Sequence, residues 1–314
     1  MRLVPALSSA QFAFNISWAK VRTMRNPSGS LSFLTLALPV GLMLGLFPGP
    51  ANAQYRRWGR YRDMTPETNQ QQEEMRKAIL PGFEEDVFTF ARLKFGDVET
   101  GYRFGNGREW DDDSPDADYI LTFRLYQVTS LKVRPGLNII DITTKDLEKY
   151  PFVYMAAAGR LVLRDSEVQD LRKYLLNGGF LMADDFWGDE QWDHFHAQIK
   201  RVFPNREPVE LTLEHPIFHT VFDFKKEPQM PSVGVYFRYG DSFEPGWPYY
   251  VKDHGPHYYA IYDDKNRIMA IICHNNHYGD GWEHEGDDKS YFERFSEAQA
   301  YPMFINILFY AMGH

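Results

Sequence analysis

Apolar residues recur along this chain with two different spacings. Short runs rich in Val, Ile, Phe and Tyr are typical of strands, whereas apolar residues three or four positions apart are typical of helices. The sequence predicts strands at 87–95, 137–143, 152–157, 180–183, 258–262 and 267–273. It predicts helices at 67–80, 115–130, 166–178, 190–202 and 298–312. From residue 87 onward the two kinds of element therefore alternate.

This alternation predicts an α/β fold. Repeated strand–helix–strand units place parallel strands in one sheet and helices on both of its faces. The residues Asp263-Asp264-Lys265-Asn266 have the composition of a hairpin turn, so the last two strands should be antiparallel. We therefore predict a mostly parallel, flavodoxin-like sheet with a late antiparallel hairpin. Residues 204–256, rich in Pro and aromatic residues, should form a long insertion over the carboxyl edge of the sheet.

The first 53 residues have the character of a secretory signal peptide. They contain four basic residues and no acid, and the apolar run 31–47 precedes Pro48-Gly49-Pro50 and Ala51-Asn52-Ala53. This order predicts export and cleavage after Ala53. A retained membrane anchor is the alternative, but the apolar run is shorter than the roughly 20 residues of a spanning helix.

The predicted domain boundaries follow from this signal. Residues 1–53 form the signal peptide, 54–86 a polar segment, and 87–314 one α/β domain. Translation could start at Met1 or at Met24, because a start at Met24 would give a signal peptide of more usual length. We expect the mature protein in the periplasm or outside the cell.

Charge and cysteine content narrow the range of partners. The chain carries a net charge of −9, and loss of the four basic residues before residue 54 lowers it to −13. Such acidity disfavours nucleic acid and anionic membranes, and it favours neutral or cationic ligands or a metal. The sole cysteine, Cys273, lies in an apolar strand, so neither an intramolecular disulfide nor a cysteine nucleophile is expected.

The first candidate site lies in the segment NGGFLMADDFWG, at residues 177–188. Asp184 and Asp185 follow a short apolar strand there, and ligands bind at the carboxyl ends of the strands in such sheets. Two close carboxylates can hold a metal or divide the roles of acid and base. They can equally cap the following helix. Trp187 offers either a stacking surface for a ligand or a core side chain.

The second candidate site is the segment CHNNHYGDGWEH, at residues 273–284. His274, His277 and Asp280 are candidate metal ligands by chemistry, although their spacing matches no established motif. One alternative is a loop that binds a sugar or an amide through Asn and Trp side chains. The other is a structural turn stabilised by its own side chains.

Two further segments have both a functional and a structural interpretation. His215, followed by Pro216, either stiffens a loop or reaches the site from the insertion. The acid-rich segment 110–116 resembles a calcium loop but lacks EF-hand spacing, so we interpret it as a helix start. The candidate catalytic residues are Asp184, Asp185 and Glu283. The candidate ligand-binding residues are Asp184, Asp185, Trp187, His215, His274, Asn275, Asn276, Asp280, Trp282 and Glu283.

Several of these segments together resemble a bacterial family with a domain of unknown function, DUF-4159. The resemblance rests on VFTFARLKF (87–95), YPFVYM (150–155), LRKYLLNGGFLMADDFWG (171–188), HPIF (215–218), NRIMAIICHNNHYGDGWE (266–283) and FYAMGH (309–314). It implies a fold similar to class I glutamine amidotransferases and to trehalose-utilisation proteins. It also implies that Asp184 stands where the amidotransferase cysteine would be, so glutaminase activity is not expected.

The same resemblance bears on metals and partners. Relatives often carry an acid at the position of His277, which argues against a zinc site made of two histidines. Members are often encoded near, or fused to, membrane proteins that resemble aerotolerance factors. This implies a membrane-protein partner in the cell envelope. A divalent metal is the one cofactor that the sequence leaves open.

Two functions follow from these observations. The missing nucleophile favours a non-enzymatic ligand-binding or scaffold module of the cell envelope, with a polar pocket for a small polar ligand such as a sugar. The density of acids and imidazoles favours instead a metal-assisted or carboxylate-based hydrolase that acts on a carbohydrate or an amide. Both hypotheses require Asp184, Asp185 and the segment 273–284 to converge in the fold.

Overall fold

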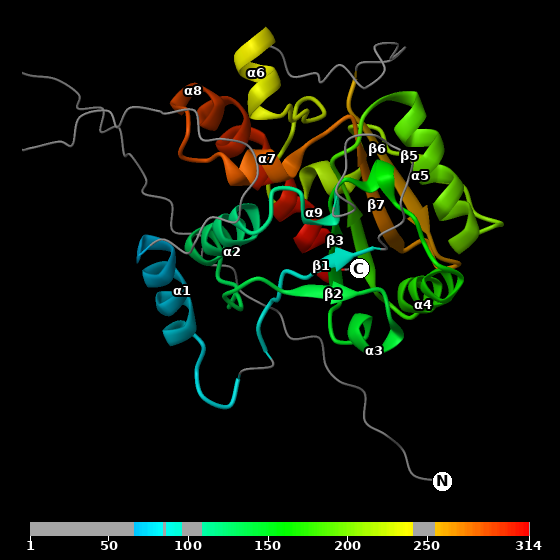
Figure 1. The fold of residues 1–314 in the computed structure, drawn as a ribbon, viewed down its shortest axis with the longest axis horizontal. Coiled ribbons are helices and arrows are strands. Elements are labelled where there is room, and N and C mark those ends of the chain that lie inside the picture. The colour runs from blue at the N-terminus through cyan, green and yellow to red at the C-terminus, as the bar shows by residue number, and fades with distance from the viewer. Residues whose placement is uncertain (1–65, 84–85, 96–108, 241–254, 314) are drawn as a thin grey trace, which may run out of the picture. The chain divides into compact units, whose positions relative to one another are not determined.

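Seven strands form one mixed sheet in the computed structural model, which describes residues 66–83, 86–95, 109–240 and 255–313 (Figure 1). The strands are β1 Arg92–Lys94, β2 Ile139–Asp141, β3 Phe152–Met155, β4 Phe180–Ala183, β5 Val209–Glu210, β6 His257–Tyr262 and β7 Ile268–His274. Their order across the sheet is β2-β1-β3-β4-β7-β6-β5. The strands β2, β1, β3, β4 and β7 are parallel, whereas β6 and β5 are antiparallel additions at one edge.

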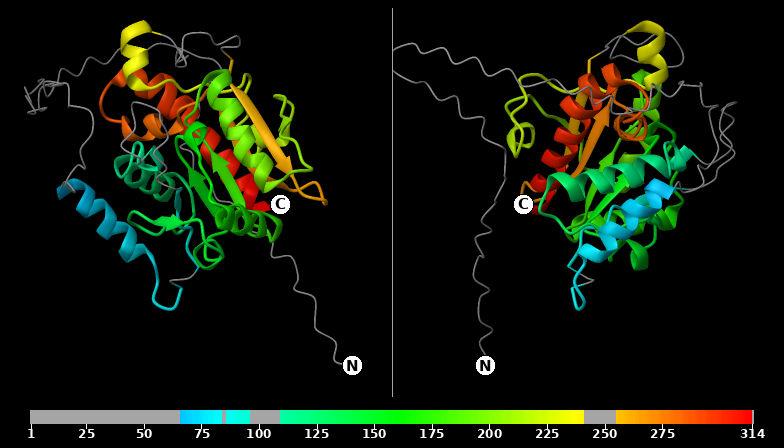
Figure 2. Two further views of the ribbon diagram at one scale, coloured as in Figure 1. Left: turned by 45° about the vertical axis from the view of Figure 1, so that its right-hand side comes forward. Right: turned by 90° about the vertical axis from the view of Figure 1, so that its left-hand side faces the viewer.

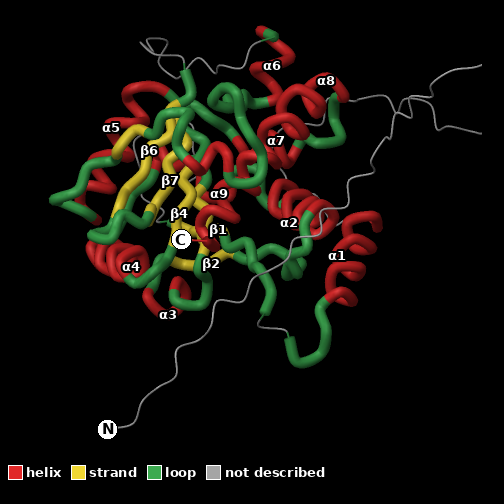
Figure 3. The backbone as a smooth tube through the Cα atoms, turned by 180° about the vertical axis from the view of Figure 1, so that it is seen from behind, coloured by secondary structure: helices red, strands yellow, loops and turns green. Residues whose placement is uncertain are grey.

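Helices cover both faces of this sheet (Figures 1 and 2). The helices are α1 Pro66–Ala78, α2 Asp116–Val128, α3 Thr144–Leu147, α4 Asp165–Leu176, α5 Gly188–Val202, α6 Val233–Tyr239, α7 Tyr278–Glu283, α8 Lys289–Tyr291 and α9 Tyr301–Gly313. Of these, α1, α6 and α8 lie away from the strands. A π-helix, Phe292–Ala300, leads directly into α9. Figure 3, from behind, shows α4 and α5 on the opposite side of the strands from α2.

The central strands are buried because helices cover both of their faces. Every residue of β3, β4 and β7 is buried, as expected for parallel strands in the middle of a sheet. Alternate side chains point to opposite faces. Val153 and Leu181 therefore join the core under α4 and α5, whereas Tyr154 and Met182 join the core under α2 and α9.

The predicted α/β sheet, mostly parallel with a late antiparallel pair, is confirmed. Two details of the prediction were wrong. The run 87–95 contributes only a three-residue strand, β1. The region 204–256 is not only an insertion over the carboxyl edge, because its strand β5 extends the sheet beside β6, and it also contains α6.

Some predictions fall outside the described residues. The predicted signal peptide, 1–53, and part of the polar segment 54–86 are among these, although α1 lies within the latter. All of the described residues belong to one unit, Arg60–His314. Among the described residues, no helix combines the length and the apolar composition needed to cross a bilayer.

The segments after β4 and β7 run side by side, and this places the candidate site. The N–H of Asn275 donates to the carbonyl of Phe186 at 2.9 Å, and the side-chain oxygen of Asn275 accepts from the N–H of Gly188 at 2.9 Å. Further along, the N–H of His277 donates to the carbonyl of Met230 at 3.0 Å. The start of α5 and the start of α7 are thereby joined at the carboxyl edge of the sheet.

A buried ion pair joins β1 to α2. The guanidinium of Arg92, fully buried in the core, donates to both carboxylate oxygens of Asp118 at distances from 2.6 to 3.2 Å. It also donates to the carbonyls of Asp112 at 2.8 Å and Trp110 at 3.3 Å. Burial opposes the charge of Arg92, but Asp118 overcomes this effect and raises the pKa of the guanidinium. The loop before α2 is therefore held against the end of β1.

Replacement of Arg92 by Met is expected to lower the free energy of unfolding by about 3–5 kcal/mol, because it leaves the buried carboxylate of Asp118 without a counter-charge. Denaturant titration followed by circular dichroism measures this loss. The control is Lys94→Met on the same strand. Nζ of Lys94 lies 4.0 Å from Oδ1 of Asp141 on the exposed surface. Such exposed ion pairs contribute only about 0–1 kcal/mol to the free energy of unfolding. Equal losses in the two variants would contradict the role given to Arg92.

Candidate functional site

Asp184 and Asp185 follow β4 directly, and their side chains have different surroundings. The carboxylate of Asp184 is fully buried and its Oδ2 accepts from the Tyr154 hydroxyl at 3.1 Å and from the N–H of Tyr278 at 2.8 Å. Asp185 has a φ of 57°, and its Oδ1 lies 3.4 Å from Nδ1 of His277. Such a left-handed conformation is costly for a non-glycine residue, and here it turns the chain between β4 and α5.

The burial of Asp184 changes its acidity. Desolvation raises the pKa of this carboxyl to about 7, although the charge of His277 and hydrogen bonds from Asp185, Tyr154 and Tyr278 lower it. Its Oδ1 has no hydrogen-bond partner of normal geometry among the described residues. Asp184 therefore links β3, β4 and α7 as a carboxyl group that holds its proton up to nearly neutral pH.

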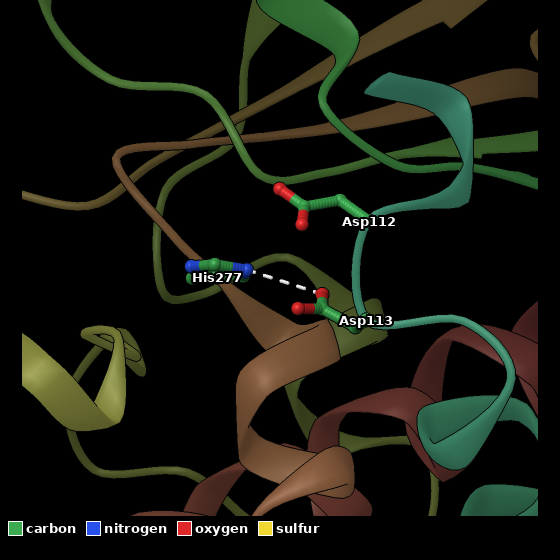
Figure 4. Close-up of side chains that lie close together, drawn as sticks. All are labelled: Asp112, Asp113 and His277. Carbon is green, nitrogen blue, oxygen red and sulfur yellow. Dashed lines mark hydrogen bonds and ion pairs between the residues drawn. The ribbon is translucent and has the colours of Figure 1, made fainter. Parts of the chain in front are cut away.

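His277 lies between carboxylates that come from distant parts of the chain. Its Nδ1 faces Asp185, whereas its Nε2 lies 3.1 Å from Oδ2 of Asp113 and 3.9 Å from Oδ1 of Asp280. Figure 4 shows that the carboxylates of Asp112 and Asp113 are both turned towards this imidazole. Burial opposes protonation of His277. The negative charges of Asp185, Asp113 and Asp280 outweigh this effect and raise the pKa of the imidazole well above its usual value.

The loop before α2 supplies the acids that face His277. Asp113, with a φ of 61°, accepts through its carbonyl from the N–H of Ala117 at 2.9 Å, so its backbone begins the turn into α2 while its side chain points to His277. Burial raises the pKa of Asp113 to about 6, and His277 opposes this rise. A Cβ atom on Gly279 would lie 1.8 Å from Oδ2 of Asp113, so only glycine permits this approach.

A second group of titratable side chains continues along α7. Nε2 of His284 lies 3.5 Å from Oδ1 of Asp280 and 3.3 Å from Oε2 of Glu283, and its Nδ1 lies 2.7 Å from Oδ2 of Asp287. Oδ2 of Asp280 accepts from the N–H of Val233 at 2.6 Å. Burial raises the pKa of Glu283 to about 7. Burial lowers the pKa of His284, but Asp287 and the other carboxylates raise it to about 9.

Two sets of side chains have the composition and proximity to hold a metal ion. One comprises Asp112, Asp113 and His277, and the other Asp280, Glu283 and His284. Within each set, one potential ligand atom from each residue lies within 4.8 Å of the others. Imidazole with carboxylate is the chemistry of divalent transition-metal sites.

The structure brings together five of the residues singled out from the sequence. They are Asp184, Asp185, His277, Asp280 and Glu283. The convergence of the two aspartates with the segment 273–284 is therefore present in the fold. Among these five, Asp184 is sealed in the interior, so its placement is that of a structural group beside the site.

His274 does not belong with His277, although only three residues separate them. Its Nε2 lies 3.1 Å from the carbonyl of Gly188, and its ring packs against Phe186 and Trp192. The three candidate metal ligands His274, His277 and Asp280 are therefore not brought together in the structure. Both sets found in the structure omit His274, because it is the last residue of β7 and its side chain points to the α5 side.

Other candidate ligand-binding residues make hydrogen bonds within the protein or are buried in its core. The side chain of Asn275 bonds to Gly188 and Gly255, and that of Asn276 accepts from the N–H of Met230 at 3.0 Å. Trp282 is fully buried and packs against core aromatic residues, so it offers no stacking face. Trp187 is also buried, at the start of α5.

His215 lies at the opposite end of the strands from the candidate site, near the start of β7. Its Nδ1 accepts from the N–H of Ile217 at 3.2 Å, and its Nε2 lies 3.4 Å from the hydroxyl of Tyr262. Tyr262 pairs with Ile268 at the start of β7, whereas the site lies beyond the end of that strand. His215 therefore does not contact the candidate site, and its contacts agree with the loop-stiffening interpretation.

Sequence reasoning missed Asp112 and Asp113, and it included His284 only as part of the candidate segment 273–284. The density of acids at 110–116 was the available signal, and it was interpreted as a helix start. That interpretation is correct for the backbone, because α2 begins at Asp116. It was incomplete for the side chains, since the contact of Asp113 with His277 spans 164 positions and no local pattern reports it.

Comparison with known proteins identifies the family. The model of the family described as Domain of unknown function (DUF4159) matches residues 89–312. The match covers well over half of the chain, so the protein belongs to this family. A comparison with curated proteins found no significant match. The matched range contains both metal-compatible sets, the turn at Asp185 between β4 and α5, and all seven strands.

Replacement of Asp184 by Asn is expected to make stability less dependent on pH. The folded-state pKa of about 7 exceeds the value of about 3.9 for an exposed aspartate. The folded protein therefore gains stability from this proton fully below about pH 4, and loses it as the pH rises through about 7. Asn imitates the protonated form and cannot ionise.

Thermal denaturation across this pH range measures the effect. We expect the Tm of the wild type to fall relative to that of Asp184→Asn as the pH rises from about 4 to about 8. Parallel curves for the two proteins would show that ionisation of Asp184 is not coupled to unfolding.

Proposed function

We propose that this protein is a divalent-cation-dependent hydrolase, with the cation held by Asp112, Asp113 and His277. The observation that carries the proposal is the position of the His277 Nε2 atom, 3.1 Å from Oδ2 of Asp113 and next to Asp112. This nitrogen and the two carboxylates face a common point from two separate loops (Figure 4). One imidazole with two carboxylates is a familiar donor set for Zn²⁺, Mn²⁺ or Fe²⁺.

The other nitrogen of His277 supports this proposal. A metal-binding histidine commonly donates its second ring N–H to a carboxylate, which sets the orientation and tautomer of the ring. Nδ1 of His277 lies 3.4 Å from Oδ1 of Asp185. With Nδ1 directed to Asp185, Nε2 is the nitrogen that faces Asp112 and Asp113. In this proposal Asp185 acts as a positioning residue for the imidazole.

The chemistry follows from the donor set. A bound divalent cation lowers the pKa of a water molecule and polarises a substrate carbonyl, so it supports hydrolysis near neutral pH. The sequence contains no cysteine nucleophile at the end of β4, and the sole cysteine, Cys273, is buried with a thiol whose pKa burial raises well above normal. A cation therefore gives this acid-rich site a route to hydrolysis of an amide or a carbohydrate without a covalent cysteine intermediate.

The non-enzymatic alternative receives less support from the geometry. A polar ligand pocket was expected to use Asn275, Asn276 and Trp282, but these side chains make contacts within the protein. Cation binding without turnover would still leave a ligand-binding or scaffold module.

We also propose that the protein is exported with cleavage after Ala53 and that it has a membrane-protein partner in the cell envelope. Amino-terminal sequencing of the mature protein tests the cleavage.

Removal of either ligand type should weaken cation binding. We expect His277→Ala and Asp113→Asn each to lower the affinity for Mn²⁺ by about tenfold or more, as measured by isothermal titration calorimetry after chelator treatment. The control is His219→Ala, which removes an exposed imidazole paired with Asp223 at 2.6 Å. Retention of wild-type affinity in both site variants would refute this cation site.

Gly279→Ala tests the site without removing a ligand. The added Cβ would lie 1.8 Å from the Asp113 carboxylate, so Asp113 must move and the Mn²⁺ affinity should fall. The matched control is Gly286→Ala in the same segment, where a Cβ meets no atom within 4 Å. Equal affinities in these two variants would contradict the placement of Asp113 in the site.

Turnover needs its own test. Chromogenic amides and glycosides should be hydrolysed by the Mn²⁺-loaded protein, and this activity should disappear with chelator and in Asp113→Asn. Mn²⁺ binding with no hydrolysis in any of these substrates would contradict the enzymatic part of the proposal and favour the binding module.

A further inference from the structure

His277 and His284 have the same kind of surroundings at the two ends of α7. Each imidazole has its Nδ1 next to a carboxylate outside its metal-compatible set: Asp185 at 3.4 Å for His277, and Asp287 at 2.7 Å for His284. Each has its Nε2 turned towards the carboxylates of its own set. The arrangement that supports a cation at His277 is therefore repeated at His284.

Asp280 joins the two sets. Its Oδ1 lies 3.9 Å from Nε2 of His277 and 3.5 Å from Nε2 of His284. Its Oδ2 is held by the N–H of Val233 at 2.6 Å, and the side chain is buried. His277 and His284 flank α7, and these two distances place the Nε2 atoms of both imidazoles beside the Asp280 carboxylate.

We propose that the site binds two divalent cations, the second held by Asp280, Glu283 and His284, with Asp280 shared between them. This inference rests on the proposed function, because the first cation is the one at Asp112, Asp113 and His277. The positive charge of two cations matches the carboxylates of the two sets, whereas Asp185 and Asp287 lie outside them, beside the imidazoles. The two sets contain four carboxylates, Asp112, Asp113, Asp280 and Glu283, and two divalent cations neutralise all four when they are ionised.

A pair of cations narrows the class of substrate. Two-metal sites stabilise both the attacking and the leaving groups of a displacement, as in aminopeptidases and phosphatases. Glycoside hydrolysis generally uses two carboxylates and no metal. Of the two substrate classes proposed above, the paired site favours the amide. The oxygen of water bonds to the carbonyl carbon, the C–N bond breaks, and a proton from the water leaves with the amine.

The test is the number of Mn²⁺ ions per chain and their magnetic coupling. Chelator-treated full-length protein is equilibrated with Mn²⁺, the bound metal is measured by mass spectrometry, and low-temperature electron paramagnetic resonance reports whether the ions interact. We expect two ions per wild-type chain with the spectrum of a coupled pair. The control His219→Ala should give the same result.

Variants of the second set remove one ion only. His284→Ala and Glu283→Gln should each bind one Mn²⁺ per chain, with the six-line spectrum of an isolated ion. Glu283→Gln keeps the shape of the side chain and leaves His284 in place, and circular dichroism checks that both variants fold. His277→Ala should also lose the coupling, because it removes the imidazole of the first cation.

The other outcomes separate this inference from the proposed function. One ion per wild-type chain, unchanged in His284→Ala, would refute the second site and leave the first in place. Two ions without coupling would refute the sharing of Asp280. No bound Mn²⁺ in the wild type would refute both the paired site and the proposed function.

Discussion

The concentration of carboxylates around His277 is the constraint on which the candidate site depends. Asp113, Asp185 and Asp280 approach one buried imidazole from three segments of the chain. Carboxylates at such distances repel one another unless protons or cations compensate. Burial and neighbouring carboxylates raise the pKa values of Asp113 and Glu283. Burial opposes protonation of His277, but Asp185, Asp113 and Asp280 raise its pKa. A site of this kind is suited to positive charge.

The rest of the domain holds these groups in place against their repulsion. Arg92 binds Asp118 and two carbonyls of the loop that carries Asp112 and Asp113. Asp184 accepts from Tyr154 and Tyr278, so it connects the centre of the sheet to the start of α7. Both contacts are buried, and buried polar groups that keep their partners give a chain a well-defined arrangement. The two loops therefore meet in a defined geometry.

Small residues and unusual backbone conformations complete this arrangement. Gly279 leaves room for the Asp113 carboxylate at the start of α7. Asp113 and Asp185 both have positive φ angles, and both side chains lie beside His277. Strained conformations of this kind persist where the surroundings enforce them, and they are often found at functional sites. Here both strained aspartates are neighbours of the same imidazole, which links the strain to the site.

The sequence by itself determined the sheet, its helices on both faces and the end of β4 where Asp184 and Asp185 lie. Strand and helix periodicity are local, and the meeting of the segments after β4 and β7 follows from the general rule that parallel strands share a carboxyl edge. Only the tertiary structure decided which side chains form the site. His274 and His277 separate because β7 ends between them, Trp282 enters the core, and Asp113 reaches His277 across 164 positions because Arg92 holds its loop. These contacts are long-range, so no local pattern of residues could report them.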